Sequence, residues 1–123
     1  MKFAEDHNDS NYQITGYDLE GVEINDVMHK QSFILSPLEI INDWQPQDLS
    51  AMRVEHLEEF YPLKPEVIIL GTGAKQIFPG REILKYLVQK RIGYEIMDTQ
   101  AACRTFNVIM GEGRTVVAGM FIK

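Results

Sequence analysis

A short glycine-rich segment, Gly71-Thr72-Gly73-Ala74-Lys75, is the strongest candidate for chemistry in the sequence. It follows the apolar run Val67-Ile68-Ile69-Leu70, which is typical of a strand buried on both faces. Open α/β sheets bind ligands at the carboxyl ends of their strands. Glycines there let backbone N–H groups face an anion, and the Lys75 ammonium would neutralise its charge. The segment therefore predicts either an anion-binding loop or a tight turn that needs glycine for backbone reasons alone.

The loop matches neither of two familiar phosphate-binding patterns. No Gly-Lys-Ser/Thr follows at the spacing of a Walker loop, and the dinucleotide fingerprint would need a third glycine where Gln76 stands. The anion hypothesis therefore depends on the position of the loop and on its lysine.

A second group of polar residues is expected beside this loop. Asp98 and Thr99 end the next strand along the chain, and Thr99, Cys103 and Asn107 recur every four residues, so they share one face of a helix. A hydroxyl, a thiol and an amide would then converge with Lys75. A thiol one turn inside a helix N-terminus can have a lowered pKa. The alternative is a buried, unreactive Cys103 and polar side chains that bind the local backbone.

Other catalytic patterns are missing from the sequence. His7, His29 and His56 have no metal-like spacing among themselves or with Cys103, and no Gly-X-Ser-X-Gly motif is present. A single cysteine excludes an intrachain disulfide. We therefore expect no catalytic residues, no metal and no cofactor.

The elements that must position these residues follow from hydrophobic periodicity. A strand meander precedes a helix capped by Asp48 or Ser50, and a β-α-β-α-β succession follows. Asn25-Asp26 predicts a tight hairpin turn, because both residues tolerate positive φ. Strands are expected over residues 12–17, 22–24, 27–30, 32–35, 67–70, 94–97 and 115–122, and helices over residues 48–60, 80–91 and 98–110.

The succession predicts a layered α/β domain. The strands on either side of the 80–91 helix should be parallel, with a right-handed crossover, and helices must cover the sheet. Val88 is expected in the buried stripe of that helix and Gly93 at its C-terminal end. Alternation of Ile40 and Trp44 should extend the meander.

Length and charge limit the function. The 123 residues predict one domain over residues 12–123 after a flexible segment, residues 1–11. The net charge is −6, which argues against nucleic acid as a partner. Residues 1–62 hold 3 Lys/Arg against 13 Asp/Glu. This acidic half indicates either a solvated face or a surface that binds a basic partner. No apolar run is long enough for membrane insertion and the acidic N-terminus is no secretory signal, so we expect a cytoplasmic protein.

Several linked motifs point to a family. The sequence resembles the Mth-like family of small domains of unknown function, which includes a mitochondrial respiratory complex I assembly factor and an adipogenesis-associated protein. The resemblance implies a three-layer fold, a β-meander followed by β-α-β-α-β around a mixed central sheet, with the last strand antiparallel to its neighbours. The motifs are Pro65-Glu66-Val67-Ile68-Ile69-Leu70-Gly71-Thr72-Gly73, Phe78-Pro79, Gly93-Tyr94-Glu95-Ile96-Met97-Asp98-Thr99, Ala101-Ala102-Cys103-Arg104-Thr105-Phe106-Asn107 and Glu112-Gly113-Arg114.

Two functional hypotheses result. The first is a non-enzymatic protein-interaction domain resembling the assembly factor, with a membrane-bound respiratory complex as the expected partner; the sequence leaves the oligomeric state open. The second is a small-molecule or anion-binding protein, with an enzyme included, that uses a crevice between residues 71–75 and 98–107. The family-matched positions are Gly71, Thr72, Gly73, Thr99, Arg104 and Asn107, and the full set of expected ligand-binding residues adds Lys75, Asp98 and Cys103.

Overall fold

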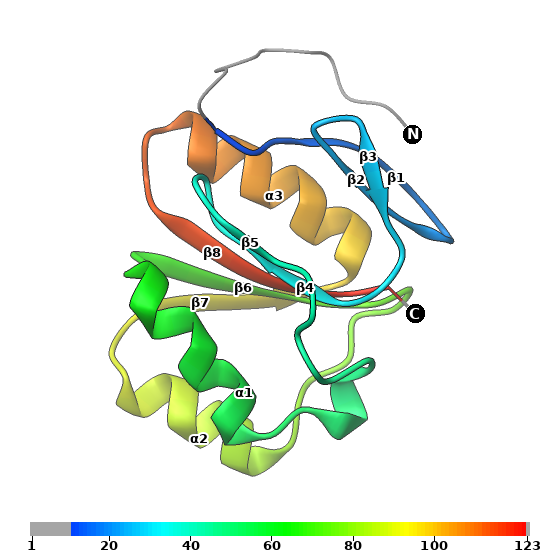
Figure 1. The fold of residues 1–123 in the computed structure, drawn as a ribbon. Helices are drawn as coiled ribbons and strands as arrows, with labels where there is room; N and C mark the ends of the chain where they lie inside the picture. The colour runs from blue at the N-terminus through cyan, green and yellow to red at the C-terminus, as the bar shows by residue number, and fades with distance from the viewer. Residues whose placement is uncertain (1–10, 123) are drawn as a thin grey trace.

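The first strands form a small antiparallel sheet in the computed structural model, which describes residues 11–122 (Figure 1). The expected flexible segment therefore lies outside the described residues, apart from Asn11. Strands β1 (Ile14–Asp18), β2 (Gly21–Ile24) and β3 (Val27–His29) pair in the order β1-β2-β3. Asn25 and Asp26 connect β2 to β3 with φ angles of 46° and 68°. The predicted hairpin turn is confirmed.

A second sheet of five strands forms the centre of the molecule. Its order is β5-β4-β8-β6-β7. Strand β6 runs parallel to both β7 and β8, whereas β4 is antiparallel to β5 and β8. The strands are β4 (Phe33–Leu35), β5 (Ile40–Ile41), β6 (Val67–Thr72), β7 (Gly93–Met97) and β8 (Val116–Phe121).

The orientation of the last strand corrects one expectation. β8 is antiparallel only to β4 and is parallel to β6, so the prediction that it would oppose its neighbours is wrong for β6. The reason is the helix between β7 and β8, which returns the chain to the starting end of the sheet. The crossover from β6 to β7 gives the predicted parallel pair.

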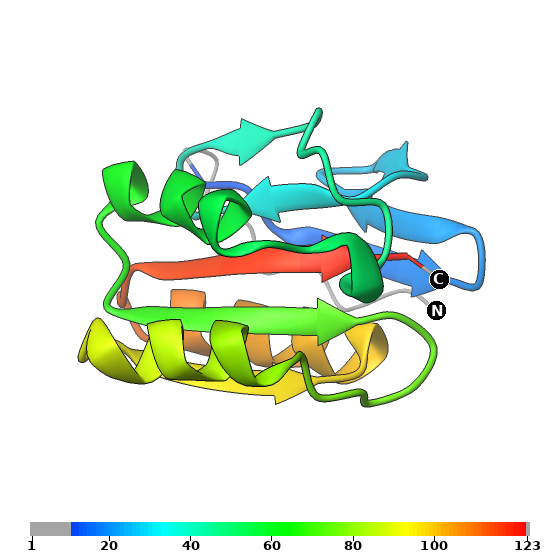
Figure 2. The ribbon, with the colours of Figure 1, turned by 90° about the horizontal axis from the view of Figure 1, so that it is seen from below.

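Helices cover both faces of the five-stranded sheet (Figures 1 and 2). Helix α3 (Thr99–Gly111) lies on one face, beside the small sheet. Helices α1 (Val54–Leu57) and α2 (Arg81–Gln89) lie on the other face, with the 3-10 helices η1 (Leu49–Ala51) and η2 (Glu58–Leu63) next to α1 in the chain. The predicted three-layer α/β architecture is therefore confirmed.

The centre of the core is β6, whose residues are all buried. Val67 and Ile69 pack on the side of α3 and the small sheet, whereas Ile68 and Leu70 pack on the side of α1 and α2. This alternation confirms the prediction of a strand buried on both faces.

The helix expected over residues 48–60 is broken into η1, α1 and η2. Asp48 caps η1 by accepting a 3.0 Å hydrogen bond from the Ala51 N–H. Met52 and Arg53 are extended, which ends η1 before α1 begins. Pro62 lies inside η2, and Lys64, with φ of 55°, ends it.

Two details of α2 also differ from the prediction. Val88 is 61% exposed rather than buried, because it lies on a side of the helix that no element within residues 11–122 covers. Gly93 begins β7, and Arg91, with φ of 58°, turns the chain after the helix instead.

Candidate functional site

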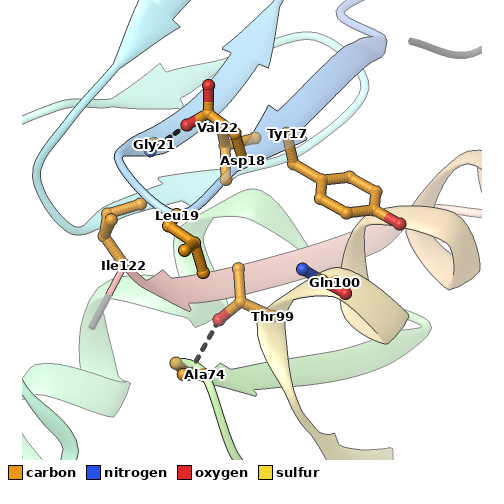
Figure 3. Close-up of a pocket in the computed structure, with 10 residues that line it drawn as sticks. Tyr17, Asp18, Leu19, Gly21, Val22, Ala74, Thr99, Gln100 and Ile122 are labelled. Carbon is orange, nitrogen blue, oxygen red and sulfur yellow. Dashed lines mark hydrogen bonds between the residues drawn. The ribbon is translucent and has the colours of Figure 1, made fainter. Parts of the chain in front are cut away.

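A cavity of about 210 Å³ opens between the β1–β2 turn and the first turn of α3 (Figure 3). Its walls are mostly carbon, and Leu19 at its rim is 79% exposed. The lining residues are Tyr17, Asp18, Leu19, Gly21, Val22, Gly73, Ala74, Thr99, Gln100 and Ile122.

The position of the cavity follows from the topology of the sheet. The chain leaves β6 through α2 to reach β7 on one side, then returns through α3 to β8 on the other side. β6 and β8 stay paired up to Thr72 and Phe121, and the cavity lies just beyond these carboxyl ends, where open α/β sheets bind ligands. Gly73 and Ile122 follow these two ends and line the cavity. The β1–β2 turn covers it from the side of the small sheet.

Thr99 joins the elements around the cavity. Its Oγ1 accepts a 2.8 Å hydrogen bond from the Gly73 N–H and donates to the Phe121 carbonyl at 2.5 Å. Its own N–H donates to the Gly73 carbonyl at 2.9 Å. Thr99 therefore ties the start of α3 to the ends of β6 and β8, and its hydroxyl both donates and accepts a hydrogen bond within the protein.

Gly73 is favoured by its backbone conformation and Gly71 by the side chains packed around it. Gly73 has φ of 99°, a conformation that L side chains rarely adopt. A Cβ on Gly71 would lie 2.7 Å from Met120 Sδ and 3.1 Å from Thr99 Oγ1. These observations support the tight-turn explanation of the Gly71-Thr72-Gly73 sequence.

Thr72 and Lys75 close the loop itself. Thr72 Oγ1 lies 2.5 Å from the Lys75 carbonyl oxygen and 3.3 Å from that of Met97, and it accepts a 3.1 Å hydrogen bond from the Ile77 N–H. The Lys75 side chain is exposed and does not line the cavity. Because the N–H groups of Gly73 and Ile77 already have partners, they are not free to bind an anion.

The side chains of Asp98 and Cys103 interact with the protein itself and not with the cavity. Asp98 Oδ1 caps α3 by accepting a 2.9 Å hydrogen bond from the Ala101 N–H. Cys103 belongs to α3, and its side chain is fully buried in the core. Burial raises the pKa of its thiol from 9.0 to about 12, although the nearby Arg104 charge opposes the shift. The thiol is therefore protonated at neutral pH and does not face the cavity.

Arg104 and Asn107 attach the small sheet to α3. Arg104 Nη1 donates a 2.7 Å hydrogen bond to the Tyr17 hydroxyl. The Asn107 amide donates to the Ile14 carbonyl at 2.7 Å and accepts from the Ile14 N–H at 3.1 Å. Asn107 thus takes the place of a neighbouring strand at this point of β1.

The structure brings only Gly73 and Thr99 of the nine expected residues to the cavity wall. The other seven hold the surrounding elements or lie outside the cavity, and a binding role for them stays a prediction. Sequence reasoning did not include Tyr17, Leu19, Gln100 and Ile122. The available signal was Leu19, an apolar residue in the otherwise polar turn Asp18-Leu19-Glu20-Gly21.

We expect Cys103 to resist thiol reagents in the folded protein. At pH 8 the native chain should react with Ellman's reagent at least 100-fold more slowly than the chain unfolded in guanidinium, which should release one equivalent. The pKa of the Cys103 thiol is about 12 in the folded chain and 9.0 without burial. The unfolded chain therefore loses this proton first as the pH rises, so the free energy of unfolding should be unaffected below about pH 9 and should fall between about pH 9 and 12. Cys103→Ala should remove that part of the alkaline destabilisation. Rapid reaction of the native thiol would contradict the burial.

Two features are absent from the described part of the chain. Among residues 11–122, no helix is long and apolar enough to cross a bilayer. Within the same residues, no three His, Cys, Asp or Glu side chains are grouped so that they could hold a metal ion.

Comparison with known proteins places this geometry in a family. Residues 14–121 match the family described as protein of unknown function DUF498/DUF598. The chain is 36% identical over 110 residues to "NADH dehydrogenase [ubiquinone] 1 alpha subcomplex assembly factor 3" of Danio rerio, covering 87% of this chain and 62% of that protein. It spans 45% of the Xenopus tropicalis protein of the same name. It is 29% identical over 90 residues to a "13 kDa major membrane protein" of Francisella tularensis, covering 72% of each.

Solved structures share the fold. A Bordetella parapertussis protein superposes with a TM-score of 0.84 at 33% identity, with 91% of this chain and 96% of that chain covered. A Mth938-like domain of Bordetella pertussis gives a TM-score of 0.79 at 27% identity, with 98% and 92% covered. The chain therefore belongs to the DUF498/DUF598 family of proteins of unknown function, in the Mth938-like fold.

Proposed function

We propose that this chain is a non-enzymatic protein-binding domain of the cytoplasm whose partner is a protein of a membrane-bound respiratory complex. The Danio rerio relative is named as an assembly factor of an NADH dehydrogenase subcomplex. The similarity covers most of this chain, which supports the same class of role here.

The engagement of the polar side chains near the cavity is the observation that carries this proposal. Thr72, Asp98, Thr99 and Asn107 all form hydrogen bonds with the backbone of neighbouring elements. The Cys103 thiol is buried and its pKa is raised. Catalysis needs a nucleophile or an acid–base pair within reach of a substrate, and these side chains do not supply one at the cavity wall.

The cavity itself suits an apolar side chain of a partner. Its volume, about 210 Å³, is below the range of about 300–1,000 Å³ that is usual for small-molecule sites. Protein interfaces are often anchored by one or two apolar side chains that fill such pockets. Leu19, which is 79% exposed at the rim, would lose its contact with water when a partner docks.

A cavity-filling variant tests the proposal. Ala74 lines the cavity and is exposed, so Ala74→Phe should fill the space and leave the fold intact. Immobilised wild-type chain should capture subunits of a respiratory complex from solubilised native membranes, identified by mass spectrometry, and Ala74→Phe should capture at least tenfold less. The matched control is Ala51→Phe, an exposed alanine at the end of η1. Absence of such subunits from the wild-type eluate, or equal capture by Ala74→Phe, would overturn the proposal.

A second candidate is a small-ligand protein that uses the same cavity, because the cavity lies where the strand order changes direction. A ligand raises the melting temperature by mass action. Stabilisation by phosphate or short-chain carboxylates that is lost in Lys75→Ala would support anion binding by the loop. Stabilisation that persists in Lys75→Ala and disappears in Ala74→Phe would place the ligand in the cavity.

A further inference from the structure

Strand β7 forms one edge of the five-stranded sheet; among residues 11–122 no strand lies beyond it. The Met97 carbonyl is directed toward β6, where Thr72 Oγ1 lies 3.3 Å away. Successive peptide groups of a strand point to opposite edges, so the Ile96 and Tyr94 groups are directed outward. The Gln76 amide donates a 2.9 Å hydrogen bond to the Ile96 carbonyl. A side chain thus occupies one position where a further strand would pair.

One side of α2 lies along this edge. The opposite side of the helix faces η2, because the Tyr86 ring lies 6.1 Å from that of Tyr61. Figure 2 shows α2 at the border of the molecule over β7, with α1 on its other side. A shallow groove on α2 is lined by Arg81, Leu84, Lys85, Val88 and Gln89.

Exposed apolar side chains lie in the groove and in the segment before α2. Val88 is 61% exposed, and Ile77 and Phe78, which precede α2, are 52% and 64% exposed. Gln76, directly before them in the chain, bonds to β7. The edge of the sheet therefore carries both outward peptide groups and apolar surface.

The charges of the groove distinguish among occupants. Arg81 and Lys85 are its charged residues, and none of its lining residues is acidic. A two-fold dimer through β7 would bring these cations against their own copies, because an isologous interface pairs identical patches. An acidic partner would instead be attracted and held in register.

We propose that the free edge of β7 and the adjoining side of α2 bind an extended acidic segment of a partner protein as an added strand. Its backbone would pair with the outward N–H groups of Tyr94 and Ile96 and displace the Gln76 amide from the Ile96 carbonyl. Successive side chains of a strand point to opposite faces, so every second residue of the segment would face α2. Among these α2-facing residues, apolar side chains would cover Leu84 and Val88 and carboxylates would face Arg81 and Lys85. This is strand addition, in which main-chain hydrogen bonds give affinity and side chains give specificity. The inference rests on the proposed protein-binding function and names a second surface for it.

Synthetic peptides test this surface on the full chain. The probe is a fluorescent pool of ten-residue peptides in which every second residue is either apolar or Asp/Glu, so that both kinds face α2, and Thr fills the positions between them. The control pool carries Lys at the acidic positions. The acidic pool should bind saturably, and the Lys pool at least tenfold more weakly. The double variant Arg81→Glu/Lys85→Glu should lose at least tenfold in affinity, whereas Lys64→Glu/Arg114→Glu, two exposed cations elsewhere, should not.

Two further measurements separate strand addition from attachment by charge alone. Hydrogen exchange at the Tyr94 and Ile96 amides should slow at least tenfold in the presence of the acidic peptides. Peptides N-methylated at alternate residues, on either register, should lose binding because they cannot pair with β7. Binding that survives N-methylation, without protection of these amides, would overturn strand addition.

The remaining outcomes also decide the inference. Failure of the acidic pool to bind overturns it, and leaves the cavity proposal intact if capture still depends on Ala74. In another outcome, the wild-type chain fails to bind the peptides and instead sediments with phosphatidylglycerol vesicles. If Arg81→Glu/Lys85→Glu abolishes that sedimentation, the surface binds lipid headgroups and strand addition is overturned. A β7-dependent dimer of the free chain would overturn it in favour of a second copy. Peptide affinity should be unchanged in Ala74→Phe.

Discussion

Replacing Ile69 by asparagine should lower the free energy of unfolding by about 2–4 kcal/mol. Ile69 is fully buried in the middle of β6, the strand that pairs with both β7 and β8. Its side chain packs in the cluster that contains Ala102 and Phe106 of α3. An asparagine amide in this apolar layer would lose its bonds to water without gaining partners, so the folded state would be penalised directly.

Denaturant unfolding followed by circular dichroism measures this effect. The matched control is Val108→Asn, because Val108 is a β-branched residue of α3 that is 62% exposed. The control should change the unfolding free energy by less than about 1 kcal/mol, as most surface substitutions do. Equal stability of Ile69→Asn and the wild type would show that β6 is not the centre of the core.

The parts of the fold that sequence reasoning predicted depend on local pattern. The run Val67-Ile68-Ile69-Leu70 is apolar at every position. This pattern is typical of a strand that is covered on both faces, because side chains on both sides must then be apolar. The buried stripe of α3 was correct because Ala102, Phe106, Ile109 and Met110 repeat with helical spacing and are all buried. The Asn25-Asp26 turn was correct because few residues other than glycine tolerate positive φ.

The errors concern features that tertiary contacts determine. Val88 has helical spacing with the buried residues of α2, but the sheet ends at β7 and nothing among the described residues covers that side. The 48–60 segment has helical periodicity, but extended residues interrupt it so that Met52, Leu57 and Phe60 can all reach the same core. The expectation of an antiparallel β8 came from the family resemblance, whereas α3 carries the chain back across the sheet, so β8 runs parallel to β6.

The candidate site was predictable in position but not in composition. The loop at Gly73 and the start of α3 do meet at a cavity, as strand topology indicated. The polar side chains, however, bond to backbone groups of other segments: Thr99 to Phe121 and Asn107 to Ile14. These partners are distant in sequence, so spacing alone could not distinguish a ligand-binding hydroxyl or amide from one that joins two elements.

Trp44→Ala should be the most damaging single truncation, with an expected loss of about 3–5 kcal/mol in unfolding free energy. Trp44 lies between β5 and η1 rather than in the alternating strand that the sequence suggested, yet it is fully buried. Its ring stacks on Phe121 at 5.1 Å and meets Phe60 edge-on at 5.6 Å, and its Nε1 donates to the His56 carbonyl at 3.2 Å.

The backbone opposite Trp44 is held in place by the sheet. Gly119 of β8 lies against the ring, since a Cβ there would be 2.8 Å from Trp44 Cη2. It is paired with Ile34 of β4 and Leu70 of β6, and it has no side chain that could fill the space that alanine would leave. A cavity should therefore remain, and the cost of a large-to-small substitution rises with the residual cavity volume. The matched control is Phe78→Ala, an aromatic truncation at a position that is 64% exposed, which should cost less than about 1 kcal/mol. The midpoints of urea unfolding measure both effects. Equal midpoints for Trp44→Ala and Phe78→Ala would show that Trp44, between β5 and α1, does not stabilise the core through its packing against β8.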